Sequence, residues 1–508
     1  MYIPCVYISV TREGTMSSGA PKPGVAGPGE SGSIRFPEGF LWSASTAGFL
    51  MDGAPLADGA GPSIQHTFAR TPGNRASGLS LEHGVDHYRR FQEDVALARE
   101  IGLQAFRFSI SWSRVFPEGV GTVNRAALDH YDALVDALLE AGITPFPYLY
   151  YWDLPAALQD RGGWANRDCA RWFADYAAVM YDRLSDRVAR WLTICEPWSI
   201  VHLGHVVGED SPGIRDLRTA LRVGHHLLLG HGLTVQAFRA GRAHGEIGLS
   251  TVMTDIRPAS DRRSDRDAAR RADCYFNRLF LDPILLGAYP DDLPDRLQRE
   301  WPSVAEGDLT VISTPIDFLG VVYYLRLSVT GSTPGHTPAD ALPDGFEQLG
   351  IAELAAIERQ ETVLAELLDV HVTDPTGPVT ELGWEIAPDG LSSVLCAIRD
   401  RYGDLPLYVA ENGAAFPDTV TADGTVEDTA RRMYIRDHLR SAHHAICDGV
   451  DLRGWSVWSL LDDPDNRFGL IHVDRETGRR TIKSSGYWYR DVIAANGLAP
   501  EDGKRADV

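Results

Sequence analysis

The sequence predicts a single-domain (β/α)₈ TIM barrel with elaborated loops, an α/β fold in which eight parallel strands close into a cylinder. Three observations predict this fold. Short apolar runs, rich in β-branched and aromatic residues, alternate with helical patterns over residues 34–495. The runs are almost continuously apolar, as parallel strands are when helices cover the outer face of their sheet. There are eight such runs, which fits one barrel better than a doubly wound sheet.

The predicted strands follow one another along the chain with helical or loop segments between them. In order they are 40–46 (FLWSAST), 105–111 (AFRFSIS), 144–152 (TPFPYLYYW), 189–196 (ARWLTICE), 245–252 (GEIGLSTV), 318–324 (FLGVVYY), 405–412 (LPLYVAEN) and 454–462 (GWSVWSLLD). Each run is short enough for a strand and too short for a typical helix.

Two connecting segments carry a clear helical pattern. Residues 86–102 repeat apolar side chains every three or four positions from Tyr88 to Ala98 and end in a glycine, and residues 128–142 show the same spacing. The stretch 325–375 is less regular and rich in glycine, proline and acids, which predicts an inserted loop over the barrel mouth.

The two ends of the chain are predicted to lie outside the barrel. Residues 1–33 are rich in serine, glycine and proline and have too few apolar side chains to pack, so we expect a disordered tail. The apolar stretch at the start has no basic residues before it and no cleavage pattern after it, so a secretory signal is not expected. Met16 is an alternative start. Residues 496–508 form a second predicted tail.

Composition excludes several classes of function. The chain has 508 residues and a formal net charge of −22, which argues against a nucleic-acid partner. Six scattered cysteines form no ligand or disulfide pattern, which favours a reducing cytoplasmic location. No apolar run reaches the roughly 18 residues that a membrane span needs. A homo-oligomer stays possible, and neither a cofactor nor a metal is implied.

Two of the predicted strands run directly into a carboxylate. In "RWLTICEPWSI" an apolar strand ends at Glu196 and Pro197 stops it, while Glu411 ends the strand in "LYVAENG". The carboxyl ends of barrel strands open onto the active site. Two acids on that face suit glycoside cleavage by an acid/base and a nucleophile. Alternatively, both acids cap helices or pair with arginine.

The motifs of this chain resemble those of family 1 glycoside hydrolases, the β-glucosidase group, over residues 36–495. The matching stretches include "FPEGFLWSAST", "GPSIQHTF", "FRFSISWSRVFPEG", "YWDLPAALQDRGGWANRD", "WLTICEPW", "PIDFLGVVYY", "GWEIAPDGL", "YVAENGAA" and "WSLLD…RFGLIHVD". The resemblance implies a retaining hydrolase of β-glycosides that acts by double displacement.

The same resemblance implies a role for each residue at a matching position. Glu196 corresponds to the acid/base and Glu411 to the nucleophile. Arg107 corresponds to a cation that keeps the nucleophile ionised, and Tyr324 to a phenol that hydrogen-bonds it. Trp458 corresponds to the aromatic platform beneath the sugar.

Other positions depart from the family pattern. Leu50 replaces a glutamine, Tyr151 a histidine, Cys195 an asparagine and Val322 another asparagine. Trp152 follows Tyr151 and is either a pocket residue or an ordinary barrel aromatic.

The segment between "SLLD" and "RFGL" is also shortened. It keeps only the residues 463–466 and lacks the family's Glu-Trp pair. The resemblance assigns these lost groups to the sugar hydroxyls. A pocket depleted of such groups suggests 2-deoxy or 2,6-dideoxy sugars on a hydrophobic natural-product aglycone, because a fully hydroxylated sugar would leave polar groups unpartnered.

Three alternatives stay open. The first is an ordinary β-glucosidase in which Asp463, Asp465 and Asn466 replace the lost groups. The second is a transglycosidase that transfers the sugar to an acceptor alcohol. The third is a non-catalytic glycoside-binding pseudoenzyme, against which the survival of both acids argues. The histidines of "GHHLLLGHG" are interpreted as packed or surface residues.

Overall fold

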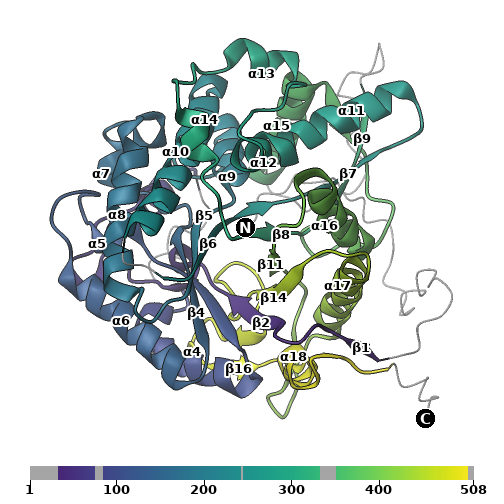
Figure 1. Ribbon diagram of the computed structural model, residues 1–508. Coiled ribbons are helices and arrows are strands. Elements are labelled where there is room, and N and C mark those ends of the chain that lie inside the picture. The colour runs from purple at the N-terminus through teal and green to yellow at the C-terminus, as the bar shows by residue number, and fades with distance from the viewer. Residues whose placement is uncertain (1–32, 75–83, 242–243, 332–350, 501–508) are drawn as a thin grey trace.

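The computed structural model describes residues 33–74, 84–241, 244–331 and 351–500 (Figure 1). Eight parallel strands form a closed barrel in the order β11-β14-β2-β3-β4-β5-β6-β8, which confirms the predicted fold class. The strands are β2 (Leu41–Ser45), β3 (Ala105–Ser109), β4 (Thr144–Tyr150), β5 (Arg190–Cys195), β6 (Glu246–Val252), β8 (Phe318–Val322), β11 (Leu407–Asn412) and β14 (Leu452–Trp458). Every predicted strand contributes one of them.

Helices surround the barrel, as Figure 1 shows. Those that follow the barrel strands are α4 (His87–Ile101), α6 (Arg125–Glu140), α8 (Asp168–Leu184), α10 (Leu217–Ala240), α16 (Pro388–Tyr402), α17 (Thr429–Cys447) and α18 (Ser484–Ala495). Helix α4 ends at Gly102, whose φ of 81° suits glycine. Helix α6 begins three residues before the predicted start, because the Asn124 side chain accepts a hydrogen bond from the Ala126 amide and caps it.

The segment between β8 and α16 contains regular structure, so its prediction as a loop was wrong. Strands β9 (Arg326–Gly331) and β10 (Val370–Val372) form a sheet with β7 (Asp255–Pro258). Helix α15 (Ile351–Leu368) precedes β10. Between β7 and β8 lie α11 (Arg263–Asp273), α12 (Leu279–Leu285), α13 (Asp295–Glu300) and α14 (Asp308–Ile312).

The barrel unit extends past its predicted carboxyl end. Strand β17 (Gly497–Leu498) pairs antiparallel with β1 (Ile34–Arg35), and Asn496 accepts a hydrogen bond from the Trp42 indole at 2.9 Å. These contacts place residues 496–498 in the fold rather than in a tail. The predicted N-terminal tail, apart from its last residue, and residues 501–508 lie outside the described ranges.

Strands β11 and β14 approach each other closely just beyond their paired residues. A Cβ atom on Gly413 would overlap the carbonyl oxygen of Trp458, so only glycine fits after Asn412. This approach fixes the end of β11, which carries Glu411, against the end of β14. Among the described residues, no helix is both long and apolar enough to cross a membrane.

Candidate active site

The carboxyl ends of the barrel strands surround a small buried cavity. Its lining consists of the two predicted acids and six mostly aromatic neighbours: Phe49, Leu50, Tyr151, Trp152, Glu196, Tyr324, Glu411 and Trp458. The cavity measures about 10 Å³ and has room for about one water molecule. The structure therefore brings together seven of the ten residues predicted for the site.

Glu196 stands at the junction between β5 and the short helix α9 (Pro197–Val201). Its φ of 49° turns the chain, and Pro197 occupies the first position of the helix. The Ser199 hydroxyl donates a hydrogen bond of 2.8 Å to its carboxylate. Burial raises the pKa of Glu196, and so does the negative charge of Glu411, while the Ser199 hydrogen bond opposes the rise.

Glu411 lies in β11 and is surrounded by phenols. The Tyr324 hydroxyl donates to Oε2 at 3.0 Å, and the Tyr151 hydroxyl lies 3.2 Å from both oxygens. The Tyr148 hydroxyl lies 3.5 Å from Oε1, and the Cys195 thiol 3.8 Å from the same atom. Burial raises the pKa of Glu411, whereas the Tyr324 hydrogen bond opposes the rise most strongly.

The two acids thus have unequal environments. Glu411 receives several donors that stabilise its charged form, and Glu196 receives one from Ser199. Of the two buried carboxyl groups, Glu411 is therefore better suited to carry the negative charge and Glu196 to keep its proton. This difference is what an acid and a nucleophile in one site require.

Arg107 acts on Glu411 through charge rather than through a direct ion pair. Its guanidinium lies 4.5 Å from the centroid of the Phe146 ring, and its charge lowers the pKa of Glu411. Its Nε and Nη1 atoms have no hydrogen-bond partner in the part of the chain that the structure describes. Because burial outweighs this charge, the net pKa shift of Glu411 is upward, and Arg107 does not by itself keep the acid ionised.

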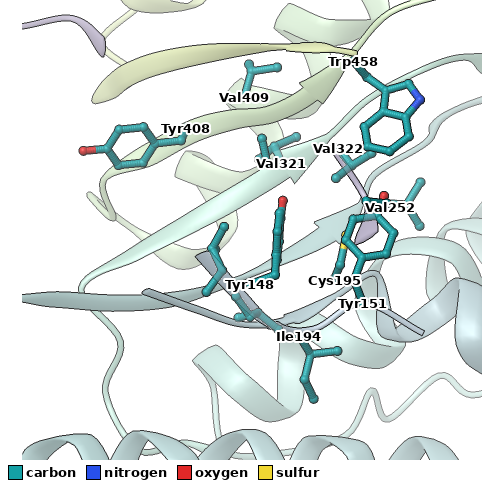
Figure 2. Packing of buried hydrophobic residues seen from close by; sticks show 14 of the residues in the cluster. Tyr148, Tyr151, Ile194, Cys195, Val252, Val321, Val322, Tyr408, Val409 and Trp458 are labelled. Atoms are coloured by element: carbon teal, nitrogen blue, oxygen red, sulfur yellow. The ribbon is translucent and has the colours of Figure 1, made fainter. Parts of the chain in front are cut away.

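Aromatic rings make up much of the cavity lining, and Figure 2 shows two of them, Tyr151 and Trp458. The Tyr151 and Trp458 rings lie nearly parallel, with centroids 6.1 Å apart. The Trp152 indole donates to the carbonyl oxygen of Cys195 at 3.0 Å, which ties the ends of β4 and β5 together. Trp152 also stacks on Phe49 with centroids 6.0 Å apart. Trp152 is therefore a cavity residue as well as a brace between strands.

The positions that depart from the family pattern are not all cavity residues. Leu50 and Tyr151 line it. Cys195 lies beside Glu411, and its thiol accepts a contact from the Ser250 hydroxyl at 3.4 Å. Cys195 and Val322 are both fully buried and do not line the cavity, and their role as substrate contacts stays a prediction.

The shortened segment after β14 is held by its own contacts. The buried Asp463 carboxylate accepts hydrogen bonds from the amides of Asp465 and Asn466 at 2.8 and 2.7 Å. None of these three residues lines the cavity. The segment therefore supplies no replacement for the missing hydroxyl-binding groups in this conformation.

One group of side chains has the composition of a metal site: Asp418, Asp462 and His472. The Lys483 ammonium lies 2.8 Å from Asp418 and 2.6 Å from Asp462 and already neutralises this group. Arg467 adds a second cation, 3.0 Å from Asp462. The cluster is better described as a buried ion-pair network than as a metal site.

Three neighbours of the acids were not predicted. Ser199 could have been found, because it lies one helical turn after Glu196 in "EPWS" and faces back toward it. Phe49 adjoins Leu50 and could have been found from that position. Tyr148 lies deep in β4, and its contact with Glu411 depends on the barrel register, which no local pattern gives.

Comparisons with known proteins agree with this geometry. The sequence pattern described as "Glycosyl hydrolase family 1" matches residues 32–498. A 1,4-beta-D-glucan glucohydrolase of Thermotoga neapolitana is 42% identical and is matched over 91% of this chain and 99% of its own length. Beta-glucosidase A of Thermotoga maritima is 41% identical, again over 91% of this chain and 99% of its own. The solved structure of a family 1 b-glucosidase from Thermotoga maritima superposes with a TM-score of 0.84, 40% identity, and coverage of 92% and 99%.

Proposed function

The chain belongs to glycosyl hydrolase family 1 and is a glycosidase of the β-glucosidase type, and on this premise we propose that it cleaves β-glycosides with retention of configuration. The Glu411 carboxylate attacks the anomeric carbon while Glu196 gives its proton to the glycosidic oxygen, so the aglycone leaves as an alcohol. A covalent ester between the sugar and Glu411 results. Glu196 then takes a proton from water, whose oxygen attacks the anomeric carbon and releases Glu411.

The observation that carries this mechanism is the unequal hydrogen bonding of the two buried acids. Tyr324 and Tyr151 donate to Glu411, which favours the ionised form that a nucleophile needs. Glu196 has one donor, Ser199, and the neighbouring negative charge keeps its proton bound. Tyr324 is a positioning residue that holds the carboxylate toward the cavity.

We further propose that the preferred sugar lacks hydroxyls, with 2-deoxy and 2,6-dideoxy glycosides as the class. Leu50 offers no hydrogen bond to a sugar, and the Tyr151 hydroxyl is engaged by Glu411. The Asp463 carboxylate is engaged by its own loop. Each unpartnered polar group costs about 1–3 kcal/mol, so two on a hydroxylated sugar would lower kcat/KM by about 30-fold or more.

An ordinary β-glucosidase is the second candidate, because the relatives at 41–42% identity carry glucoside-cleaving names. Another relative, 38% identical, is named a bifunctional beta-D-glucosidase/beta-D-fucosidase. D-fucose lacks the hydroxyl at carbon 6, so a similar scaffold is named for both a hydroxylated and a deoxygenated sugar. The two candidates predict opposite orders of kcat/KM for a β-D-glucoside and its 2-deoxy analogue.

The deciding experiment compares aryl β-D-glucoside with its aryl 2-deoxy analogue, each corrected for spontaneous hydrolysis. Our proposal expects a higher kcat/KM for the 2-deoxy substrate. A matched variant, Cys195→Asn, reintroduces the amide that the family resemblance places beside the acid/base and should move the ratio toward the glucoside. Faster cleavage of the glucoside by the wild-type protein would favour the ordinary β-glucosidase. No cleavage of any aryl β-glycoside would contradict the mechanism itself.

A further inference from the structure

Helices α8, α10 and α13 border a second pocket, outside the barrel, whose charged lining is almost entirely cationic. Helix α10 contacts both α8 and α13 and lies between them in Figure 1. The pocket measures about 450 Å³. Its charged or titratable lining residues are Arg167, Arg218, Arg222, His226, Arg299 and Glu300. Four arginines and a histidine thus face a single acid in a chain with a net charge of −22.

This imbalance is not a general property of concave surfaces in the protein. A larger cleft of about 760 Å³ lies between α11, α16 and β7. It is also lined by four arginines, but by four aspartates as well: Arg257, Arg270, Arg278, Arg401, Asp255, Asp273, Asp291 and Asp292. In that cleft acids and bases balance. In the α8–α10–α13 pocket four arginines face one glutamate, so the positive charge there is only partly compensated by the lining.

Two of the pocket arginines are anchored at its edge. The Arg167 guanidinium donates to Asp308 at 2.7 Å, and Asp308 is also held by the His225 ring at 2.8 Å. The Arg218 guanidinium donates to Glu300 at 2.8 Å. These contacts fix the position of both cations without occupying the pocket between them.

The other two arginines are available to a ligand. Within the described ranges, no ion pair includes Arg222 or Arg299. Arg222 lies one helical turn after Arg218 on α10, and His226 follows one turn later, so the three side chains line one face of the helix. Arg299 approaches from α13, on a different element.

His226 also lines the pocket, beside Arg222. Its Nδ1 atom lies 2.9 Å from the carbonyl oxygen of Trp164, so this nitrogen carries the proton and Nε2 is left toward the pocket. Burial lowers the pKa of His226, and the positive charges of Arg167 and Arg222 lower it further. The lowered pKa favours the neutral form of His226, so the positive charge of the pocket comes from its arginines.

We propose that this pocket binds a phosphate monoester, with the dianionic phosphoryl group between Arg222 and Arg299. Guanidinium groups present paired N–H donors that match phosphate oxygens, and arginine is common in phosphate sites for this reason. The wall beside Arg299 is apolar, with Trp301, Pro302 and Val304. The organic part of the ester would pack on that wall, since the volume exceeds what a phosphoryl group alone fills.

The test measures binding of inorganic phosphate and of a hexose monophosphate by calorimetry and by ³¹P line broadening. The wild-type protein is compared with the double variant R222Q/R299Q. The matched control is R270Q, which removes an exposed arginine from the balanced cleft. Thermal melting of each variant verifies that it is folded. None of these residues lines the active-site cavity.

We expect both ligands to bind the wild-type protein and R270Q equally well, and the double variant at least tenfold more weakly, because two charge-assisted contacts are lost. The hexose monophosphate should bind more tightly than phosphate. Equal binding to the wild-type protein and the double variant, or no binding at millimolar ligand, would overturn the site. Equal affinity for the two ligands would overturn the role given to the apolar wall.

Discussion

The hydroxyl group of Tyr151 lies 3.2 Å from each carboxylate oxygen of Glu411. Tyr151 therefore stands directly in front of the group that must reach the anomeric carbon, and the cavity left beside it holds about one water molecule. A sugar ring is far larger than that. In the proposed mechanism, Tyr151 therefore bears both on the charge of Glu411 and on access to it.

Replacing Tyr151 with phenylalanine should shift the pH profile. The Tyr151 hydrogen bond lowers the pKa of Glu411, so its loss raises that pKa. Because Glu411 must be ionised to attack, the acidic limb of the profile of kcat/KM against pH should move upward by about one unit. The control is Tyr150→Phe, which removes a hydroxyl that does not face the cavity. An unchanged acidic limb would contradict the hydrogen bond.

Replacing Ser199 with alanine should shift the alkaline limb of the profile of kcat/KM against pH. The Ser199 hydrogen bond stabilises the charged form of Glu196 and lowers its pKa, so the variant should have a higher pKa. Glu196 acts as an acid only while protonated, and the alkaline limb of kcat/KM should therefore move to higher pH. Ser393→Ala, on α16 and away from the cavity, is the control. A shift to lower pH would show that Ser199 has another role.

The roles of the two acids can be separated by chemical rescue. In Glu196→Ala, turnover of substrates with poor leaving groups should fall by about 10²- to 10⁴-fold, because the departing oxygen is no longer protonated. With an activated aryl glycoside, breakdown of the covalent ester limits turnover, and azide should restore that turnover by attacking the ester and yielding the β-glycosyl azide. In Glu411→Ala, azide would enter from the side vacated by the carboxylate and yield the α-glycosyl azide. Product stereochemistry is the readout. The reverse pattern of products would exchange the two assignments.

The buried ion-pair network of Asp418, Asp462 and Lys483 should contribute strongly to the free energy of unfolding. Replacing Lys483 with methionine leaves the buried carboxylates of Asp418 and Asp462 without their nearest cation, at an expected cost of about 3–5 kcal/mol in the free energy of unfolding. The exposed pair of Arg490 and Asp491 offers a control, because Arg490→Met should cost at most about 1 kcal/mol. Urea unfolding measures both.

The same network makes a prediction about acid stability. The pKa values of Asp418 and Asp462 are lowered in the folded protein, chiefly because the Lys483 charge and hydrogen bonds from His472 outweigh burial. The contribution of these two carboxylates to the free energy of unfolding is fully present above their unfolded pKa of about 4. It is lost as the pH falls below that value. Unfolding measured between neutral and acid pH should therefore depend less on pH in Lys483→Met than in the wild-type protein.

The eight barrel strands and both acids were predictable because their signals are local. A strand that ends on a carboxylate is visible in "LTICEP" and in "YVAENG", and the barrel then places both ends on one face. Helix α15 was not predicted. Its sequence does repeat apolar residues at helical spacing, but the glycine, proline and acidic residues around it favour a loop.

The family resemblance predicted one phenol beside Glu411, Tyr324, but no sequence signal predicted that Tyr148 and Tyr151 join it. Tyr148 lies within β4, Tyr151 follows its last residue and Tyr324 follows β8, and their convergence depends on the register of several strands. For the same reason, sequence reasoning counted Val322 and Cys195 among the cavity residues. A shared strand end does not decide which side chain reaches the interior space and which lies behind it.

The close approach of Gly413 to the Trp458 carbonyl bears on how this pocket can diversify. Since no side-chain carbon fits between the two strands, the positions of Trp458 and Glu411 are tied to each other. New sugar specificities should therefore arise by substitutions on the facing wall, at Leu50 and Tyr151. A laboratory evolution campaign would gain most by randomising those two codons and leaving the glycine untouched.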